Sequence, residues 1–325
     1  MPFQIIRNDI TKVRADVIVN TANPQPKIGG GTDSAVYAAA GADALLAERR
    51  KIGSIEPGQA AATPAFALPA KYIIHTVGPV WQDGRSGEKD ILRACYENTL
   101  ALAEELHAES IAFPLIAAGV YGFPKEEALN IALSEIGKFL LTHDTDVLLV
   151  VFDRAAFKLS AQIVGEINEF IDEHGVNAAQ ETEYAGRYGQ DRERRLRNAR
   201  ENLPDSLDDM LSRAGDTFQQ RLFRLIDASG MDDVTVYKKA NIDRKVFSSI
   251  RCKADYKPSK KTAVAFAIAL ELTMPEMREL LACAGIALSN SDTFDLIISY
   301  CVKNGIYDIY KINAFLFDYG QPALG

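Results

Sequence analysis

Hydrophobic positions in the first half of the chain follow two different periods. Short runs of consecutive apolar, often β-branched residues are typical of strands covered on both faces of a sheet. Between these runs, apolar residues recur every three or four positions, as on amphipathic helices. The pattern predicts strands over 3–6, 16–21, 72–77, 110–116 and 146–152, and helices over 33–50, 88–106, 125–141 and 155–174. This alternation predicts an α/β fold with three layers, α/β/α, around a mostly parallel or mixed sheet.

The second half of the chain shows only the helical period. Groups of apolar residues at that spacing begin at Phe218, Met277, Phe294 and Ile309. Glycines that suit helix ends follow three of the predicted helices, at Gly285, Gly305 and Gly320. The stretch between the halves lacks apolar periodicity and is rich in charge. We therefore predict a first domain over 1–175, a charged connector over 176–213 and a small all-α domain over 214–325.

Composition narrows the class of protein. With 325 residues, 47% hydrophobic and 25% charged, the chain matches a water-soluble globular protein. Its apolar runs stay below the roughly 20 residues that cross a bilayer, and its first residues carry no export signal, so we expect a cytoplasmic protein without a membrane partner. Four dispersed cysteines predict reduced thiols and no structural metal. We also expect no cofactor.

Charge is divided unevenly along the chain. The net charge is -8, and residues 1–175 hold 15 Lys and Arg against 23 Asp and Glu. In contrast, residues 231–262 hold nine basic and four acidic residues. The charge distribution therefore allows nucleic-acid binding as a function of the second half of the chain only.

Two glycine-rich loops follow predicted strands in the first half. They cover 20–34 and 117–124, and the first ends where a helix begins. Backbone amides in such loops can hold an anion at the carboxyl ends of strands, so a phosphate-bearing ligand between the loops is one interpretation. Tight chain connection is the other. Neither loop carries a Walker sequence or a dinucleotide fingerprint.

Five sequence strings, taken together, resemble the macrodomain family in order and spacing. They are NDIT at 8–11, DVIVNTAN at 16–23, IGGGTDSAV at 28–36, YIIHTVGPVW at 72–81 and GVYGFP at 119–124. The resemblance covers about residues 1–175. It implies a macrodomain fold and a ligand that is ADP-ribose, or a substrate carrying an ADP-ribosyl group.

The resemblance also assigns ligand contacts. Asp9, followed by Ile10, matches the aspartate that accepts a hydrogen bond from the adenine amino group, although it could simply cap a turn. The two loops would hold the pyrophosphate and distal ribose, and Phe157 would pack on adenine. Tyr121 and Phe157 could instead be core residues. The loop residues assigned in this way are Asn23, Gly29, Gly30, Gly31, Ala118, Gly119, Val120, Tyr121 and Gly122.

Asn23 and Asp33 match the catalytic pair of the hydrolytic branch of the family. The resemblance implies that Asn23 orients the distal ribose and that Asp33 activates or positions a water. As an alternative, Asp33 could only N-cap its helix. We interpret Asn20 as structural and His75, in an apolar strand, as a hydrogen-bonded core histidine.

Several positions depart from the hydrolase pattern. Ser34 replaces a glycine, Tyr37 replaces a histidine, and Ala117 and Ala118 replace hydroxyl residues. The sequence therefore favours, by a small margin, an O-acetyl-ADP-ribose deacetylase-like hydrolase acting on mono-ADP-ribosylated protein or O-acyl-ADP-ribose. The alternative is a non-catalytic reader or sensor of ADP-ribose.

The segment 234–277 is similar to phage-repressor-type helix-turn-helix domains, with helices expected over 236–240, 243–251 and 259–272. Residues that could contact DNA on the second helix are Arg244, Lys245, Ser248 and Arg251. The same surface could be merely solvated, or it could bind a protein. The last two helices could complete the core or form a homodimer surface. A bacterial-type transcription regulator tuned by a nucleotide metabolite would combine both halves.

Overall fold

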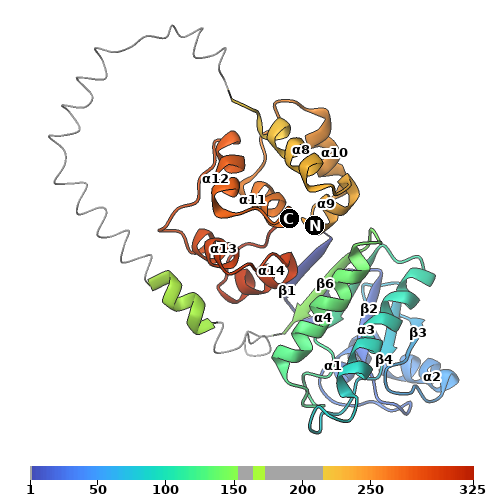
Figure 1. Ribbon diagram of the computed structural model, residues 1–325. Coiled ribbons are helices and arrows are strands. Elements are labelled where there is room, and N and C mark those ends of the chain that lie inside the picture. Colours follow the sequence, from blue (N-terminus) through green and yellow to red (C-terminus); the bar gives the residue numbers. More distant parts are fainter. Residues whose placement is uncertain (1, 153–163, 173–214) are drawn as a thin grey trace, which may run out of the picture. The chain divides into compact units, whose positions relative to one another are not determined.

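The computed structural model describes residues 2–152, 164–172 and 215–325. Contacts group the chain into two compact units (Figure 1). The first unit comprises Met1–Ser160, Asn241–Asp243 and Ile309–Ala323; the second comprises Ala161–Ala240, Arg244–Asp308 and Leu324–Gly325. Residues 241–243 and 309–323 thus belong with the first unit. The sequence pattern instead predicts that the first domain ends at residue 175. The connector predicted over 176–213 lies outside the described residues and stays a prediction.

A six-stranded sheet forms the centre of the first unit. Its strands are β1 (Phe3–Arg7), β2 (Val17–Thr21), β3 (Ala60–Pro64), β4 (Tyr72–Thr76), β5 (Ser110–Pro114) and β6 (Asp146–Val151). They lie in the order β1-β6-β5-β2-β4-β3, and all neighbours are parallel except β3 and β4. The prediction of an α/β fold with a mixed sheet is confirmed. β3 was not predicted, because three alanines followed by Thr63 and Pro64 have little strand propensity and only the pairing with β4 defines the strand.

Helices cover both faces of this sheet. The helices α1 (Thr32–Ala40) and α2 (Ala42–Ile52) pack on one face, in a core that includes Ile18, Ile73 and Val150. The helices α3 (Glu88–Glu105) and α4 (Lys125–Leu140) pack against each other, and α3 packs on β3 and β4. Both helices lie in front of the sheet in Figure 1. The single helix predicted over 33–50 is wrong. It is interrupted at Gly41, whose φ of 100° lies in the left-handed region that favours glycine.

The outer strand β1 is closed by residues from the second half of the chain. The Asn241 side chain accepts a hydrogen bond from Phe3 N at 2.9 Å and donates one to Phe3 O at 3.0 Å. The helix α14 (Ile309–Asp318) packs along the same strand, with the Phe3 and Tyr310 rings 5.3 Å apart, edge to face. A side-chain amide therefore satisfies backbone groups that an open sheet edge would expose.

The second unit is helical in its described residues. Its helices are α8 (Phe218–Ser229), α9 (Asp233–Lys239), α10 (Arg244–Cys252), α11 (Lys260–Ala269), α12 (Met274–Cys283) and α13 (Thr293–Lys303), and residues 164–172 are also helical. Gly285 and Gly305 follow α12 and α13 with φ of 69° and 68°, as predicted for helix ends. Over the described ranges, none of the helices has both the length and the apolar character that crossing a bilayer requires.

Candidate functional site

A cavity of about 520 Å³ lies at the carboxyl ends of β5 and β6, beside the start of α1. Ligands of open α/β sheets bind at this edge, outside the carboxyl ends of the strands. Part of the ligand-binding set predicted from the sequence lines the cavity, namely Asp9, Ile10, Gly31, Ala118 and Gly119. The two glycine-rich loops and the loop after β1 therefore meet around one space.

Asp33 is the second residue of α1 and is 2% exposed. One of its carboxylate oxygens accepts a hydrogen bond from Asn20 Nδ2 at 2.6 Å, and the other accepts one from Gly29 N at 2.5 Å. The N-cap of α1 is Gly31, so the alternative that Asp33 only caps its helix is wrong. Burial raises the pKa of Asp33, and the Asn20 and Gly29 hydrogen bonds offset this rise only in part.

A chain of buried hydrogen bonds supports the Asp33 carboxylate. Asn20 Nδ2 also lies 3.1 Å from His75 Nδ1, and His75 Nε2 lies 3.0 Å from Thr63 Oγ1. Because the amide nitrogen can only donate, Nδ1 accepts and Nε2 carries the proton that His75 donates to Thr63. Burial lowers the pKa of His75 to about 3, and so keeps the ring neutral. Asn20 and His75 therefore orient Asp33. Their burial and hydrogen bonds agree with the sequence interpretation of Asn20 as structural and of His75 as a hydrogen-bonded core histidine, although the contact with Asp33 was not predicted.

Asn23 and Asp33 lie against the same side of Gly29. A Cβ at residue 29 would be 2.4 Å from Asn23 Nδ2 and 3.2 Å from Asp33 Oδ2. The Asn23 amide donates to Lys27 O at 3.3 Å, within its own loop. Only glycine leaves room for both side chains, so the first glycine loop brings together the two residues that sequence reasoning paired.

The second glycine loop approaches the first through Val120. Its side chain is 79% exposed and lies 3.7 Å and 3.9 Å from where a Cβ would stand on Gly31 and Gly30. Gly122 N donates to Gly119 O at 3.0 Å, which closes the loop into a turn. Burial, followed by the charge of Asp33, raises the pKa of Tyr121.

The loop before α3 supports this second glycine loop. The Glu88 carboxylate accepts hydrogen bonds from backbone N–H groups between residues 82 and 86, and hydrogen bonding to backbone amides lowers its pKa to about 2. The same loop carries Trp81, whose backbone N–H donates to Tyr121 O at 2.9 Å and whose ring packs edge to face on Phe123. A buried carboxylate thus orders the support of Tyr121.

The far end of the cavity is formed by residues after β1 and β6. Asp9 accepts hydrogen bonds from Thr11 N and Oγ1 at 3.0 and 2.7 Å and caps a short 3₁₀ turn. The hydrogen bond from the Thr11 side chain is the main cause that lowers its pKa. Asp9 therefore caps a turn and also lines the cavity. Phe157, predicted to pack on adenine, lies outside the described residues.

Sequence reasoning missed four polar or aromatic residues of the cavity lining, namely Asn8, Thr32, Lys125 and Phe152. Phe152 is 75% exposed at the end of β6. An exposed phenyl ring beside a carboxylate suits a ligand with a flat base. Its position directly after an apolar strand is the sequence signal that could have identified it.

Comparison with known proteins places this site in a family. The Macro domain family model matches residues 19–132. A Macro domain-containing protein of Methanosarcina mazei is 43% identical over 51% of this chain and 89% of its own length. This chain belongs to the Macro domain family. An O-acetyl-ADP-ribose deacetylase of Salmonella typhimurium is 41% identical over 50% of this chain and 93% of its own. A solved Oceanobacillus iheyensis macrodomain with ADP is 38% identical, covering 47% of this chain and 85% of its own with a TM-score of 0.45.

The departures of this Macro domain from the hydrolase pattern have definite places. Ser34 Oγ donates to Gly31 O at 2.9 Å, so it braces the first glycine loop. Tyr37 is buried behind Asp33, and burial raises its pKa. Ala117 begins the second loop with a φ of 60°, an unusual conformation for a residue with a Cβ. Ser34, Tyr37 and Ala117, which depart from the hydrolase pattern, thus help to hold the two glycine loops and Asp33 in place.

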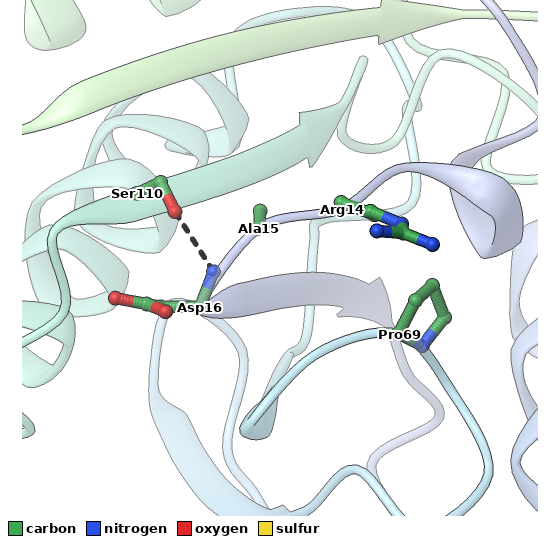
Figure 2. Close-up of a pocket in the computed structure, with 5 residues that line it drawn as sticks. All are labelled: Arg14, Ala15, Asp16, Pro69 and Ser110. Atoms are coloured by element: carbon green, nitrogen blue, oxygen red, sulfur yellow. Dashed lines mark hydrogen bonds between the residues drawn. The ribbon is translucent and has the colours of Figure 1, made fainter.

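A second cavity of the Macro domain, of about 460 Å³, lies at the opposite, amino end of the sheet. Figure 2 shows its lining, in which the Asp16 carboxylate points away from Arg14. Asp16 N donates to Ser110 Oγ at 2.9 Å, and Lys71 Nζ lies 2.9 Å from the Asp16 carboxylate. These groups join the starts of β2 and β5.

In the described residues, no group of three or more His, Cys, Asp or Glu is placed to hold a metal ion.

The helices predicted over 236–240, 243–251 and 259–272 correspond to α9, α10 and α11, with shifted ends. Of the residues predicted to contact DNA, Arg244, Lys245 and Ser248 are exposed on α10. Arg251 forms an ion pair with Asp233 and stacks 4.8 Å from the Phe223 ring centre, so its guanidinium is already engaged. The resemblance to phage repressors, contact with DNA or a protein, and a homodimer stay predictions.

Proposed function

We propose that the first unit binds ADP-ribose and hydrolyses the bond between an ADP-ribosyl group and its substituent, with Asp33 activating the water. One observation supports this most directly. Asn23 and Asp33 lie on one side of Gly29, at the loops that border the cavity. Relatives named O-acetyl-ADP-ribose deacetylase, at about 40% identity, support the same reaction class.

In this proposal the cavity residues divide the ligand between them. Phe152 and Asp9 meet the adenine through stacking and a hydrogen bond. Backbone amides of the two glycine loops hold the pyrophosphate, beside the positive end of α1. The distal ribose then lies towards Asn23 and Tyr121.

Asp33 is suited to hold a water. A carboxylate offers about four lone-pair sites, and Asn20 and Gly29 use one on each oxygen. As the water oxygen forms a bond to the carbon under attack, Asp33 accepts a proton from that water. This carbon is the ribose carbon that carries the side chain in an ADP-ribosylated protein, and the acyl carbon in O-acetyl-ADP-ribose. The bond from this carbon to the leaving oxygen breaks, and that oxygen leaves with the electron pair, taking the proton from Asp33 where a ribose hydroxyl is formed. A raised pKa strengthens Asp33 as a base.

The test compares the wild type with Asp33→Ala on two substrates, a protein mono-ADP-ribosylated on acidic side chains and O-acetyl-ADP-ribose. We expect release by the wild type and a loss of about 100- to 10,000-fold in the variant, while calorimetry shows ADP-ribose affinity largely kept. Asp43→Ala is the matched control, because Asp43 is an exposed aspartate on α2. ADP-ribose binding by a wild type that releases neither substrate would contradict hydrolysis and leave a reader.

A further inference from the structure

Arg49 on α2 is a charged residue without access to water. It is 1% exposed and belongs to the largest fully buried side chains of the described chain. Arginine is almost never fully buried unless its charge and its donors are satisfied. Its next neighbour on the helix, Arg50, is exposed. The burial of Arg49 therefore requires a specific explanation.

The guanidinium binds the loop that carries Asn23. Its Nη2 donates to Asn23 O at 3.3 Å and to Pro24 O at 3.2 Å, and its Nη1 donates to Gly53 O, just after α2. Within the described residues, its hydrogen-bond partners are these backbone carbonyls. One planar group thus fastens the end of α2 to the exit of β2.

The loop after β2 depends on such outside donors. Pro24 and Pro26 have no N–H group, so this stretch has few donors with which to stabilise itself. Ala22 N is bound to Thr76 O, and Pro24 O accepts a second hydrogen bond from Ile55 N at 2.9 Å. Arg49 is the side chain that holds the carbonyl of Asn23 itself. A shift of this carbonyl would carry the Asn23 side chain with it.

The charge of Arg49 also acts on Asp33. Burial raises the pKa of Asp33, and the positive charge of Arg49 opposes this rise. Burial lowers the pKa of Arg49 itself, while Tyr37 and Asp33 act to raise it. The backbone of Asn23 and the carboxylate of Asp33 therefore share one buried cation.

We propose that Arg49 is a positioning residue that fixes Asn23 through its backbone and supplies the positive charge behind Asp33. This inference rests on the proposed hydrolysis for its effect on turnover. Its effect on the Asn23 loop is independent of any reaction.

Three variants separate the two roles. Arg49→Met removes the charge and the donors, Arg49→Lys keeps a charge but loses the planar fork, and Arg50→Met is the matched control. We expect kcat to fall about 100-fold in both Arg49 variants, as a misplaced group near the reaction can cause. The acid limb of the rate-pH profile should move to higher pH in Arg49→Met but not in Arg49→Lys. Arg50→Met should match the wild type in both measurements.

A second readout does not need turnover. The side-chain amide signal of Asn23, assigned in a nuclear magnetic resonance spectrum, should shift in Arg49→Lys, and the ADP-ribose Kd should rise. If the wild type releases no substituent, hydrolysis fails, but these two measurements still decide the role of Arg49. Folding is checked by thermal unfolding, and Arg49→Lys carries the test if Arg49→Met does not fold. Wild-type kcat, Kd and Asn23 signal in a folded Arg49 variant would overturn the inference.

Discussion

The two ends of the sheet in the first unit carry similar parts with different consequences. Each end has a cavity, of about 520 Å³ at the carboxyl end and about 460 Å³ at the amino end. Each also has an aspartate that accepts a hydrogen bond from a backbone amide, Asp33 from Gly29 N and Asp16 from Glu109 N. Cavity volume and an amide-bound carboxylate therefore do not distinguish a functional site from a structural joint.

The pKa values of the two aspartates do distinguish the ends. Burial would raise the pKa of Asp16, but hydrogen bonds from Lys71, Glu109 and Ser110, together with the Lys71 charge, hold it below the ordinary value. Burial prevails at Asp33 and raises its pKa. A carboxylate kept in a less favourable charged state is typical of sites that perform chemistry. At the amino end, the same residue type serves to join strands.

Among variants that keep both Asp33 and Arg49, the largest expected effect comes from Gly29→Ala at the carboxyl end. The new Cβ would lie 2.4 Å from Asn23 Nδ2 and 3.2 Å from Asp33 Oδ2, so both side chains must move. We expect kcat/KM to fall about 100-fold, measured by release of ADP-ribose from a modified protein. Gly30→Ala is the matched control, because its Cβ would meet only Val120, at 3.9 Å. Equal activities for the two variants would show that packing at Gly29 does not set the site.

Phe152→Ala should weaken binding rather than turnover. Loss of a base-stacking ring typically costs about 1–3 kcal/mol, so we expect the ADP-ribose Kd to rise about tenfold or more in calorimetry. Phe66→Ala provides the control, since Phe66 is also an exposed phenyl ring, between β3 and β4. An unchanged Kd for Phe152→Ala would remove this residue from the adenine end of the site.

The sequence predicted those parts of the site that depend on a local pattern of residues. Strands followed by glycine loops identified the carboxyl end, and the resemblance paired Asn23 with Asp33, which do lie together at Gly29. Contacts between distant residues carry no local signal. The Asn241–Phe3 hydrogen bonds join residues 238 positions apart, and Arg49 on a helix surface reads as one more exposed charge. β3 was missed for the same reason, because its partner strand defines it.

The aspartates should also give opposite pH dependences of stability. The folded-state pKa of Asp16 is lowered, so its stabilising contribution is present above the ordinary value of 3.8 and is lost as the pH falls through the folded pKa. The folded-state pKa of Asp33 is raised, so its contribution declines as the pH rises from 3.8 through the folded pKa. Denaturant unfolding of the wild type, Asp16→Ala and Asp33→Ala across this range measures both differences. Slopes of the same sign would contradict the contrast between the two ends.

The smallest functional effect is expected from Ser110→Ala at the amino end. Ser110 Oγ accepts the hydrogen bond from Asp16 N at 2.9 Å, and its loss leaves that amide with fewer acceptors. Because a typical hydrogen bond contributes about 0.5–1.5 kcal/mol, the free energy of unfolding should fall by about 1 kcal/mol, while the Kd for ADP-ribose and kcat stay at wild-type values. Ser54→Ala, at an exposed serine, controls for removal of a hydroxyl group. A change in Kd for Ser110→Ala alone would mean that the amino end communicates with the ligand, and the division between a structural and a functional end of the sheet would then be wrong.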